Sequence, residues 1–470
     1  MRIFVALCAL AGLIGPTFVR AADVPQSAET KPVSFYREVR PILQRHCSGC
    51  HQPAKSGGKL VLTSFDGFRK GGENGASYIP GKADDSLILQ YVVGDPPEMP
   101  RGADPLKPAQ IEILRRWINE GAVEDAPVAA ADPYTQDHPP IYSSPPVITA
   151  LAYSPDSQTL AVSGHHEVLL HKADGTGRIA RLIGRSPKIN SIDFSPDGKL
   201  LATTGGSPAK FGEVQLWDAA AHVVKSSTEI SFDTLFGGAF SDDSRQFSFG
   251  AFDNKARVMD VESAKVVMTM EAHSDLVFDT TFSLKLDHLI SVSRDMAMKL
   301  TEIKTAQFID NITSITPGAL KGGLMAVQRH PKEEQVLIGG ADGEPKLYKI
   351  FRTQARQIGD DFNKIRAYPA IPGRIVSLQF SADGSMFVVG SSNATSGAAR
   401  IYQTDDAKVL HELPGHTSGV FAVAFRPDGK QVATGGFDGK VRLFDVETGT
   451  LVAEFIPVEI TPAVAGAAAP

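Results

Sequence analysis

Two cysteines and a histidine form the most distinctive chemical motif of the chain. They are Cys47, Cys50 and His51, spaced as Cys-x-x-Cys-His. At this spacing two thiols can add to the two vinyl groups of one haem, and the histidine that follows can bind the iron from one face. The motif therefore predicts one covalent haem c, with Cys47 and Cys50 as thioether anchors and His51 as an axial iron ligand.

Two other uses of a Cys-x-x-Cys pair stay open. A structural zinc site needs four ligands, normally including a second cysteine pair, and the whole chain has 3 cysteines. A thioredoxin-like redox pair is expected between a strand and a helix, whereas here an amphipathic helix is predicted before the pair. Haem attachment is therefore the favoured interpretation.

Met99 is the candidate for the second axial ligand. It is the only methionine between His51 and the end of the first predicted domain, and it lies in a Pro-Pro-Glu-Met-Pro loop whose prolines would stiffen the backbone. The alternative is a methionine that fills a gap in the core. Ligation by His51 and Met99 would give a six-coordinate iron with a raised reduction potential. Such an iron has no free position for a substrate, which favours electron transfer over catalysis.

Residues 1–21 predict a secretory signal peptide. A positive start, an apolar run over residues 3–13 and small residues after it are typical of a cleaved leader. Cleavage would remove Cys8 and leave Cys47 and Cys50 as the mature cysteines. The apolar run is too short to cross a bilayer as a helix, and no later segment reaches that length. We therefore expect a periplasmic or otherwise exported protein without an integral membrane segment.

The haem motif lies in a predicted small all-α domain over residues 32–125. Apolar residues at helical spacing predict a helix over 34–45, with Ser34 as its cap. A second amphipathic helix is predicted over 106–121, with Gly121 as its stop. Two helices around a Gly/Pro-rich middle would bury little apolar surface alone, so a bound haem would supply part of the core.

A repeated strand predicts a seven-bladed β-propeller over residues 147–457. The repeats are 42 to 54 residues apart and each contains a Pro-Asp-Gly-like turn, which is typical of four-stranded propeller blades. The aligned strand residues are His171, Trp217, Met259, Thr301, Tyr348, Tyr402 and Phe444. We expect residues 126–146 to be an Ala/Pro-rich linker, residues 458–470 to be a disordered tail, and the strand at Leu451–Phe455 to close the ring by pairing with the first blade.

Two family resemblances follow from these motifs. The ordered series VRPILQRHCSGCH, SGGKLVL, PGKADDSLILQYV, MPRG and QIEILRRWINEGA is similar to the cytochrome c domain widespread in planctomycetes and related bacteria. That resemblance implies covalent haem at Cys47 and Cys50, with axial ligation by His51 and Met99. The last repeat resembles a WD repeat, in which the residues matching His416, Thr434 and Asp438 form a buried hydrogen-bonded group with an aromatic residue, here Phe444.

The sequence favours an exported, non-enzymatic electron carrier whose propeller docks a protein redox partner. Two alternatives stay open: an oxidoreductase whose propeller has its own active site, and an interaction scaffold that contains a haem. The adjacent His165 and His166 are the one candidate for a further metal or cofactor site, although surface histidines seldom have such a role. The net charge of −6 and pI near 6.1 argue against a nucleic-acid partner.

Overall fold

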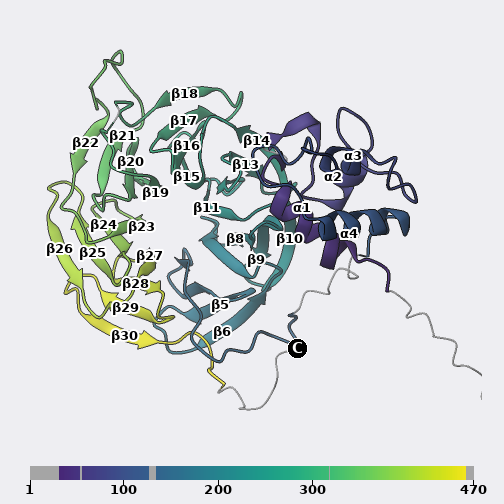
Figure 1. Ribbon diagram of the computed structural model, residues 1–470. Coiled ribbons are helices and arrows are strands. Elements are labelled where there is room, and N and C mark those ends of the chain that lie inside the picture. Colours follow the sequence, from purple (N-terminus) through teal and green to yellow (C-terminus); the bar gives the residue numbers. More distant parts are fainter. Residues whose placement is uncertain (1–30, 53–54, 126–133, 317, 462–470) are drawn as a thin grey trace, which may run out of the picture. The chain divides into compact units, whose positions relative to one another are not determined.

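A computed structural model describes residues 31–52, 55–125, 134–316 and 318–461 (Figure 1). The chain divides into two compact units, Met1–Ala126 and Pro127–Pro470, which we call the N-terminal and C-terminal units. Residues 1–21 lie outside the described residues, so the signal peptide stays a prediction. None of the helices that the structure describes is long and apolar enough to cross a membrane.

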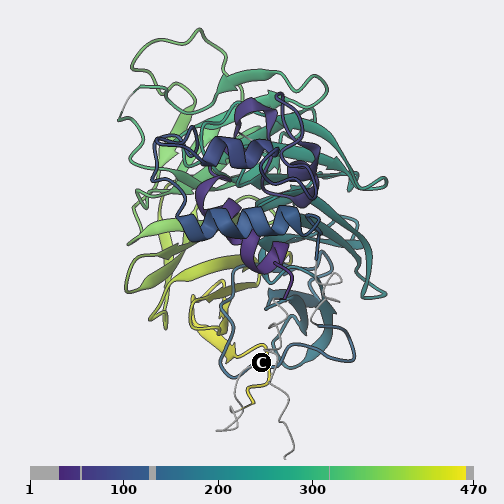
Figure 2. The same ribbon diagram turned by 45° about the vertical axis from the view of Figure 1, so that its right-hand side comes forward.

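The N-terminal unit is small and contains few helices (Figure 2). One two-residue strand pair, β1 with β2, accompanies them, so the predicted all-α fold is not confirmed. The elements are a π-helical turn η1 (Phe35–Val39), α1 (Arg40–His46), β1 (His51–Gln52), β2 (Lys55–Ser56), a 3-10 turn η2 (Gly57–Lys59), α2 (Phe65–Lys70), α3 (Leu87–Val92) and α4 (Pro108–Asn119).

The first and last helices of this unit begin and end at residues that the sequence indicates. The Ser34 hydroxyl accepts the Arg37 N–H at 3.0 Å and caps η1. Pro41 lies in the first turn of α1, where a missing N–H has no cost. Helix α4 ends at Asn119, and Gly121 follows with a φ of 104°, a left-handed conformation that favours glycine.

Aromatic side chains form the centre of the N-terminal unit. Trp117 of α4 packs against Phe35 of η1, Phe68 of α2 and Tyr78, with ring centroids 5.4, 5.8 and 5.0 Å apart. Its indole N–H donates to the Val123 carbonyl at 3.1 Å, so the buried polar atom has a partner. Elements η1, α2 and α4 are therefore joined through one indole ring.

The C-terminal unit is a seven-bladed β-propeller of four-stranded antiparallel sheets, as predicted. Each blade uses four consecutive strands. Blades 1 to 4 contain β3 (Leu151–Tyr153), β4 (Thr159–Ser163), β5 (Glu167–Lys172), β6 (Arg178–Ile183); β7 (Lys188–Phe194), β8 (Leu200–Ser207), β9 (Phe211–Asp218), β10 (Val223–Ser231); β11 (Leu235–Phe240), β12 (Gln246–Ala251), β13 (Ala256–Asp260), β14 (Lys265–Met270); and β15 (Val277–Phe282), β16 (His288–Ser293), β17 (Met298–Glu302), β18 (Phe308–Asn311). Blades 5 to 7 contain β19 (Leu324–Arg329), β20 (Gln335–Gly340), β21 (Lys346–Lys349), β22 (Lys364–Ala367); β23 (Arg374–Phe380), β24 (Met386–Ser392), β25 (Gly397–Gln403), β26 (Val409–Leu413); and β27 (Val420–Phe425), β28 (Gln431–Gly436), β29 (Val441–Asp445), β30 (Leu451–Phe455).

The repeated turn joins the first two strands of a blade through a serine and an aspartate. In blade 2 the Ser195 hydroxyl donates to Asp197 at 2.7 Å, and the Lys199 N–H donates to the same carboxylate at 3.1 Å. The hydroxyl and then the N–H lower the pKa of Asp197 to about 2. The same serine–aspartate bond recurs at Ser154 and Asp156, Ser241 and Asp243, and Ser381 and Asp383. All seven aligned residues of the third strands are buried.

Ring closure differs from the prediction. Strand Leu451–Phe455 pairs with β29 of its own blade, because blade 1 already has four strands of its own. Instead, two flanking segments meet at the seam between blades 7 and 1. We call residues 134–148 the entry segment and residues 456–461 the exit segment. Tyr142 bridges Ile460, its carbonyl accepts the Thr461 N–H at 2.8 Å, and the Ile148 N–H donates to Gly436 at 2.9 Å.

A buried polar cluster fixes the entry segment to blade 1. The Tyr142 hydroxyl donates to Glu167 at 2.7 Å, and Arg181 donates two hydrogen bonds to the same carboxylate. Arg181 also donates to the Pro140 carbonyl at 2.7 Å. Tyr142 lies in the predicted linker, and Val458 in the predicted tail, yet both side chains are buried. The two segments are thus part of the propeller.

Candidate functional site

The Cys-x-x-Cys-His motif forms a tight turn directly after α1. The Cys47 N–H donates to the Leu43 carbonyl at 2.9 Å, and the N–H groups of Cys50 and His51 both donate to the Cys47 carbonyl at 3.1 Å. The His51 carbonyl then accepts the Leu62 N–H at 2.8 Å. The helix end and this later contact hold the three residues in one short, hydrogen-bonded segment.

The two thiols of this turn are free and differ in environment. Cys47 is half-buried and packs against the apolar core of the unit, whereas Cys50 is exposed. Burial raises the pKa of the Cys47 thiol to about 11. Near neutral pH this thiol is therefore protonated, and it lies in an apolar environment.

His51 has a buried ring nitrogen without a partner among the described residues. Its Nδ1 is enclosed and makes no hydrogen bond there. The ring lies beside Gly57, where an added Cβ would be 3.6 Å from His51 Cε1. An unpaired buried polar atom costs about 1–3 kcal/mol, so it needs an explanation such as a bound ion or water. A bound ligand or a water molecule could provide the missing partner of this nitrogen.

Met99 lies on the same apolar core as Cys47. Both side chains are half-buried and pack against the cluster that contains Phe35, Phe68 and Trp117. The Met99 N–H donates to the Tyr91 carbonyl at 2.9 Å, which holds the proline-rich loop to the end of α3. The structure thus brings the Met99 loop and the cysteine motif to one core. Axial ligation by Met99 stays a prediction.

His165 and His166 have aromatic and backbone neighbours. Their rings are 4.5 Å apart, and both contact the Tyr134 ring, at 6.0 and 5.0 Å. His165 Nδ1 lies 3.0 Å from the Pro187 carbonyl. Within the described ranges, no group of three or more His, Cys, Asp or Glu side chains is placed to hold a metal ion.

Two family models match parts of the chain. Residues 47–101 match the model for Planctomycete cytochrome C, and residues 176–207 and 407–445 match that for the WD domain, G-beta repeat. The predicted resemblances are confirmed. The first match covers the haem motif and Met99, which identifies the N-terminal unit as the cytochrome c-like part of the chain. The second covers parts of blades 1, 2, 6 and 7.

Curated relatives resemble part of the chain at low identity. Periodic tryptophan protein 2 of Saccharomyces cerevisiae is 23% identical over 57% of this chain and 31% of its own length. The Arabidopsis thaliana protein of that name is 25% identical over 52% and 25%. Apoptotic protease-activating factor 1 of Homo sapiens is 22% identical over 64% and 25%. The chain therefore spans about a third or less of each of these relatives.

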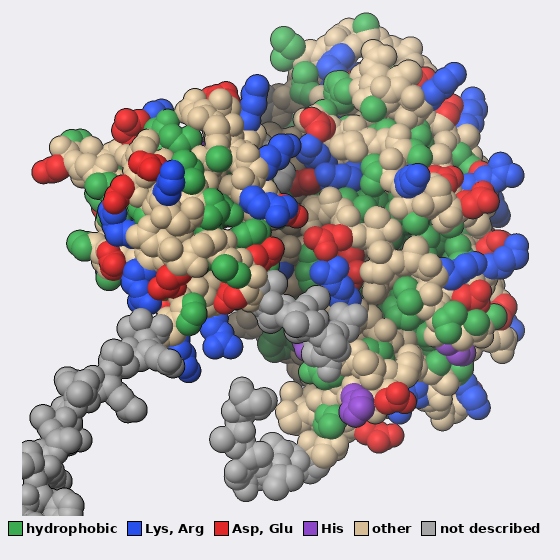
Figure 3. Space-filling model, turned by 90° about the vertical axis from the view of Figure 1, so that its right-hand side faces the viewer, with side chains coloured by type: hydrophobic (Ala, Val, Ile, Leu, Met, Phe, Trp, Pro, Cys, Tyr) green, Lys and Arg blue, Asp and Glu red, His purple; other side chains and the backbone are tan. Residues whose placement is uncertain are grey.

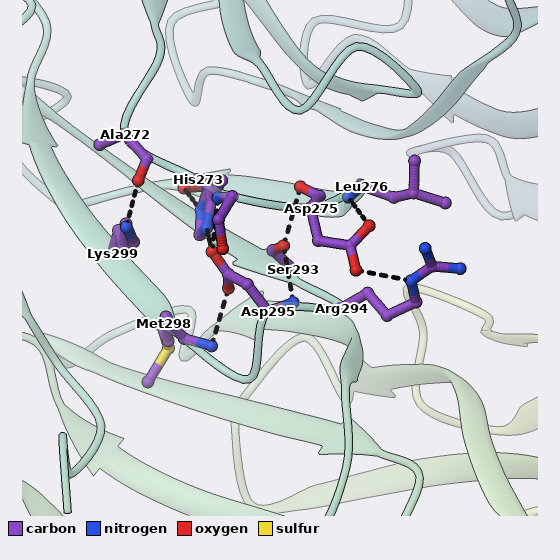
Figure 4. Close-up of polar contacts among 12 residues, drawn as sticks. Ala272, His273, Asp275, Leu276, Ser293, Arg294, Asp295, Met298 and Lys299 are labelled. Atoms are coloured by element: carbon purple, nitrogen blue, oxygen red, sulfur yellow. Dashed lines mark hydrogen bonds and ion pairs between the residues drawn. The ribbon is translucent and has the colours of Figure 1, made fainter. Parts of the chain in front are cut away.

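Blade 4 of the WD propeller contains a hydrogen-bonded group that the sequence analysis missed (Figure 4). His273 contacts Asp295 through Nδ1 and Ser291 through Nε2, both at 2.9 Å, and the Ser274 N–H donates to Asp295 at 3.0 Å. The His273 and Ser291 side chains are buried, so the group holds the loop that precedes β15 onto the blade. The sequence contains the signal for this group as His273, Ser291 and Asp295 in that order. The aligned residue of the third strand in this blade is Thr301, whereas an aromatic residue stands there in the blade 7 repeat.

The predicted group in blade 7 is looser. His416 Nε2 and the Thr434 hydroxyl are 3.5 Å apart, and the His416 and Phe444 rings are 5.9 Å apart. Asp438 instead accepts from Arg442 at 2.7 Å. Burial, and then the Arg442 charge, lower the pKa of His416 to about 4. Arg442 therefore takes the bond to Asp438 that would complete the predicted group.

The inner strands of the WD propeller surround a central channel of about 1260 Å³. Asp193 accepts the Phe240 N–H at 2.9 Å, and Asp279 accepts the Val327 N–H at 3.0 Å, so each carboxyl group links its blade to the next. Burial raises the pKa of both carboxyl groups to about 7. On the outside, Lys and Arg side chains alternate with Asp and Glu on the face that Figure 3 shows.

Proposed function

We propose that this protein is an exported c-type cytochrome that transfers single electrons and uses its WD propeller to dock a protein redox partner. Cys47 and Cys50 are the thioether anchors of one haem c, and His51 and Met99 are its axial ligands. The observation that carries the proposal is the free Cys-x-x-Cys-His turn inside the segment that matches Planctomycete cytochrome C.

The residues present fit this cofactor. Two free thiols in one turn supply the attachment points, and His51 has a buried nitrogen without a hydrogen-bond partner in the part of the chain that the structure describes. Met99 supplies a soft thioether at the edge of the same core. A haem bound there would supply a one-electron Fe(III)/Fe(II) couple, and His/Met ligation gives such haems a raised reduction potential.

The polypeptide has two further tasks in this proposal. The aromatic core around Trp117 contacts both the Cys47 turn and the Met99 loop. This common core would keep the axial ligands His51 and Met99 in position in either oxidation state of the iron. The WD propeller provides the docking surface, because WD-type propellers are in general protein-interaction modules. Export by residues 1–21 would bring the chain to the compartment in which haem c is attached.

Spectroscopy of the full-length chain tests the proposal. Matured in a host that attaches haem c, the protein should retain one haem after acid extraction and show the methionine–iron charge-transfer band when oxidised. Met99→Ala should lose this band and lower the reduction potential, since a sulfur ligand is removed. Met296→Ala, in the WD propeller, is the matched control and should change neither property.

Two results would contradict the assignment. A wild-type band that persists in Met99→Ala would exclude Met99 as the ligand while leaving the haem in place. Haem that is extracted by acid from the wild type, or retained in a Cys47→Ser, Cys50→Ser double variant, would exclude covalent attachment.

A further inference from the structure

The first strands of blades 2 to 7 share one local irregularity beside the central channel. The pairing of the first strand with the second shifts register near the start of each, so the first strand contains one extra residue there. The residues at these bulges are Asn190, Phe236, Phe278, Met325, Val376 and Phe421, and all of them line the channel. Bulges often re-aim a side chain next to a functional site. Blades 3 to 7, whose first strands surround the centre of the ring in Figure 1, therefore each place a large apolar side chain at one cavity.

Five of these side chains form a continuous apolar wall, which we call the apolar arc: Phe236, Phe278, Met325, Val376 and Phe421. All five are half-buried, so each keeps part of its surface open to the channel. The rings of Phe236 and Phe278 meet edge to face, with centroids 5.1 Å apart. A contiguous apolar surface that lines a cavity is typical of a small-molecule site.

Polar residues complete the ring of channel-lining positions in blades 1 and 2. The Thr149 hydroxyl donates to the Ile189 carbonyl, and the Asn190 amide donates to the Leu235 carbonyl at 2.6 Å. Both side chains thus bond to the propeller itself. The apolar arc is therefore the part of this ring that is left for contact with a bound molecule.

The charged residues of the lining differ in how far the protein already pairs them. The two acidic residues accept backbone N–H groups: Asp193 from Phe240, and Asp279 from Thr280 and Val327, at 2.9 to 3.0 Å.

The two basic residues of the lining have no such partners. Lys188 and Arg374 are the first residues of β7 and β23, and both are exposed. Among the residues that the structure describes, neither side chain makes a hydrogen bond or an ion pair. The lining therefore has unused positive donors at the start of the inner strands, whereas its acceptors are in use.

We propose that the central channel binds a small aromatic anion. Its ring system would lie on the apolar arc, and its acidic group would lie beside Lys188 and Arg374. A cavity of about 1260 Å³ has room for such a molecule. An aromatic body fits better than an alkyl chain because three residues of the arc are phenylalanines, which favour edge-to-face and offset contacts with a further ring. This site is separate from the proposed haem chemistry and does not depend on it.

Calorimetric titration of the full-length chain with three probes of one ring system tests the proposal. The probes are naphthoate, naphthalenemethanol and naphthylmethylammonium, at up to millimolar concentration. Naphthoate should bind with the highest affinity, since it alone supplies a negative charge. This comparison uses the wild type, so it does not depend on the folding of any variant.

Substitutions in the arc locate the bound probe. Phe278→Ser and Phe421→Ser each remove a ring that would cover the naphthalene, and each should lower the affinity for naphthoate at least about tenfold. Phe308→Ser, at a 40% exposed phenylalanine of the outer strand β18, is the matched control and should leave the affinity unchanged.

Substitutions of the basic residues test the charge. Lys188→Gln and Arg374→Gln should each weaken naphthoate about two- to fivefold, the size expected for an exposed ion pair, without changing the affinity for naphthalenemethanol. Lys172→Gln, at an exposed lysine of β5 outside the channel lining, is the matched control.

Three results would overturn the proposal. The absence of binding by naphthoate would exclude the site. Binding that is unchanged in both Phe278→Ser and Phe421→Ser would place the probe outside the apolar arc. Tightest binding of naphthylmethylammonium, or equal affinity for all three probes, would exclude an anion as the preferred ligand.

Discussion

The seam between the first and last blades gives the most direct quantitative prediction. Tyr142→Phe removes a hydroxyl group that donates to Glu167 at 2.7 Å and accepts the His165 N–H at 3.0 Å. Glu167 keeps both hydrogen bonds from Arg181, so its charge stays paired. Hydrogen bonds to charged groups contribute about 1.5–3 kcal/mol, and we expect a loss of about 2 kcal/mol in the local stability of the seam.

Amide hydrogen exchange measures this loss where it occurs. The Thr461 N–H donates to the Tyr142 carbonyl and the Ile148 N–H donates to Gly436, so both amides report on opening of the seam. A loss of about 2 kcal/mol in the local stability of the seam corresponds to amide hydrogen exchange that is about 30-fold faster. Tyr134→Phe is the matched control, since the Tyr134 ring contacts with His165 and His166 remain. Unchanged exchange at the seam, or equal acceleration in all seven blades, would refute this reasoning.

Three further predictions concern stability. Trp117→Ala should destabilise the N-terminal unit by about 3–5 kcal/mol, seen as loss of exchange protection in α4 with the blades unaffected. His171 is buried beside the Pro457 carbonyl, and burial lowers its pKa to about 4. The unfolded chain therefore binds a proton first as the pH falls from about 6.5 to 4. Denaturant titrations should show that stability is lost over this window in the wild type and less so in His171→Gln. A propeller beginning at residue 134 should melt at a higher temperature than one beginning at residue 147, because only the longer chain contains Tyr142; equal melting temperatures would contradict the role of the entry segment.

Much of the propeller could be predicted because its signals are local. The residue before the last in each third strand, such as Trp217 or Tyr402, is aligned between the repeats and buried in the structure. The Ser-x-Asp turns recur in four of the blades and make their own hydrogen bonds, as at Ser195. Such features depend on neighbours within a few residues, so one sequence is enough to find them.

The ring closure could not be predicted, because it depends on contacts between the two ends of the propeller. His171 contacts the Pro457 carbonyl and Tyr153 donates to Gln431, across 286 and 278 residues. The Ala/Pro-rich composition around Tyr142 also resembles that of a linker, and nothing local indicates its partner Glu167. At the candidate haem site the motif spacing gave Cys47, Cys50 and His51, but the unpaired Nδ1 of His51 depends on packing and has no sequence signal.

The entry segment contacts both ends of the propeller ring. Its side chain Tyr142 binds Glu167 of blade 1, and its backbone binds Thr461 after blade 7. The entry segment therefore contacts blade 1 well before the start of β3, since Gln136 donates to the Arg181 carbonyl and the Pro140 carbonyl accepts from the Arg181 side chain. Because Tyr142 bonds to both ends of the ring, opening of the seam would break its hydrogen bond with Thr461.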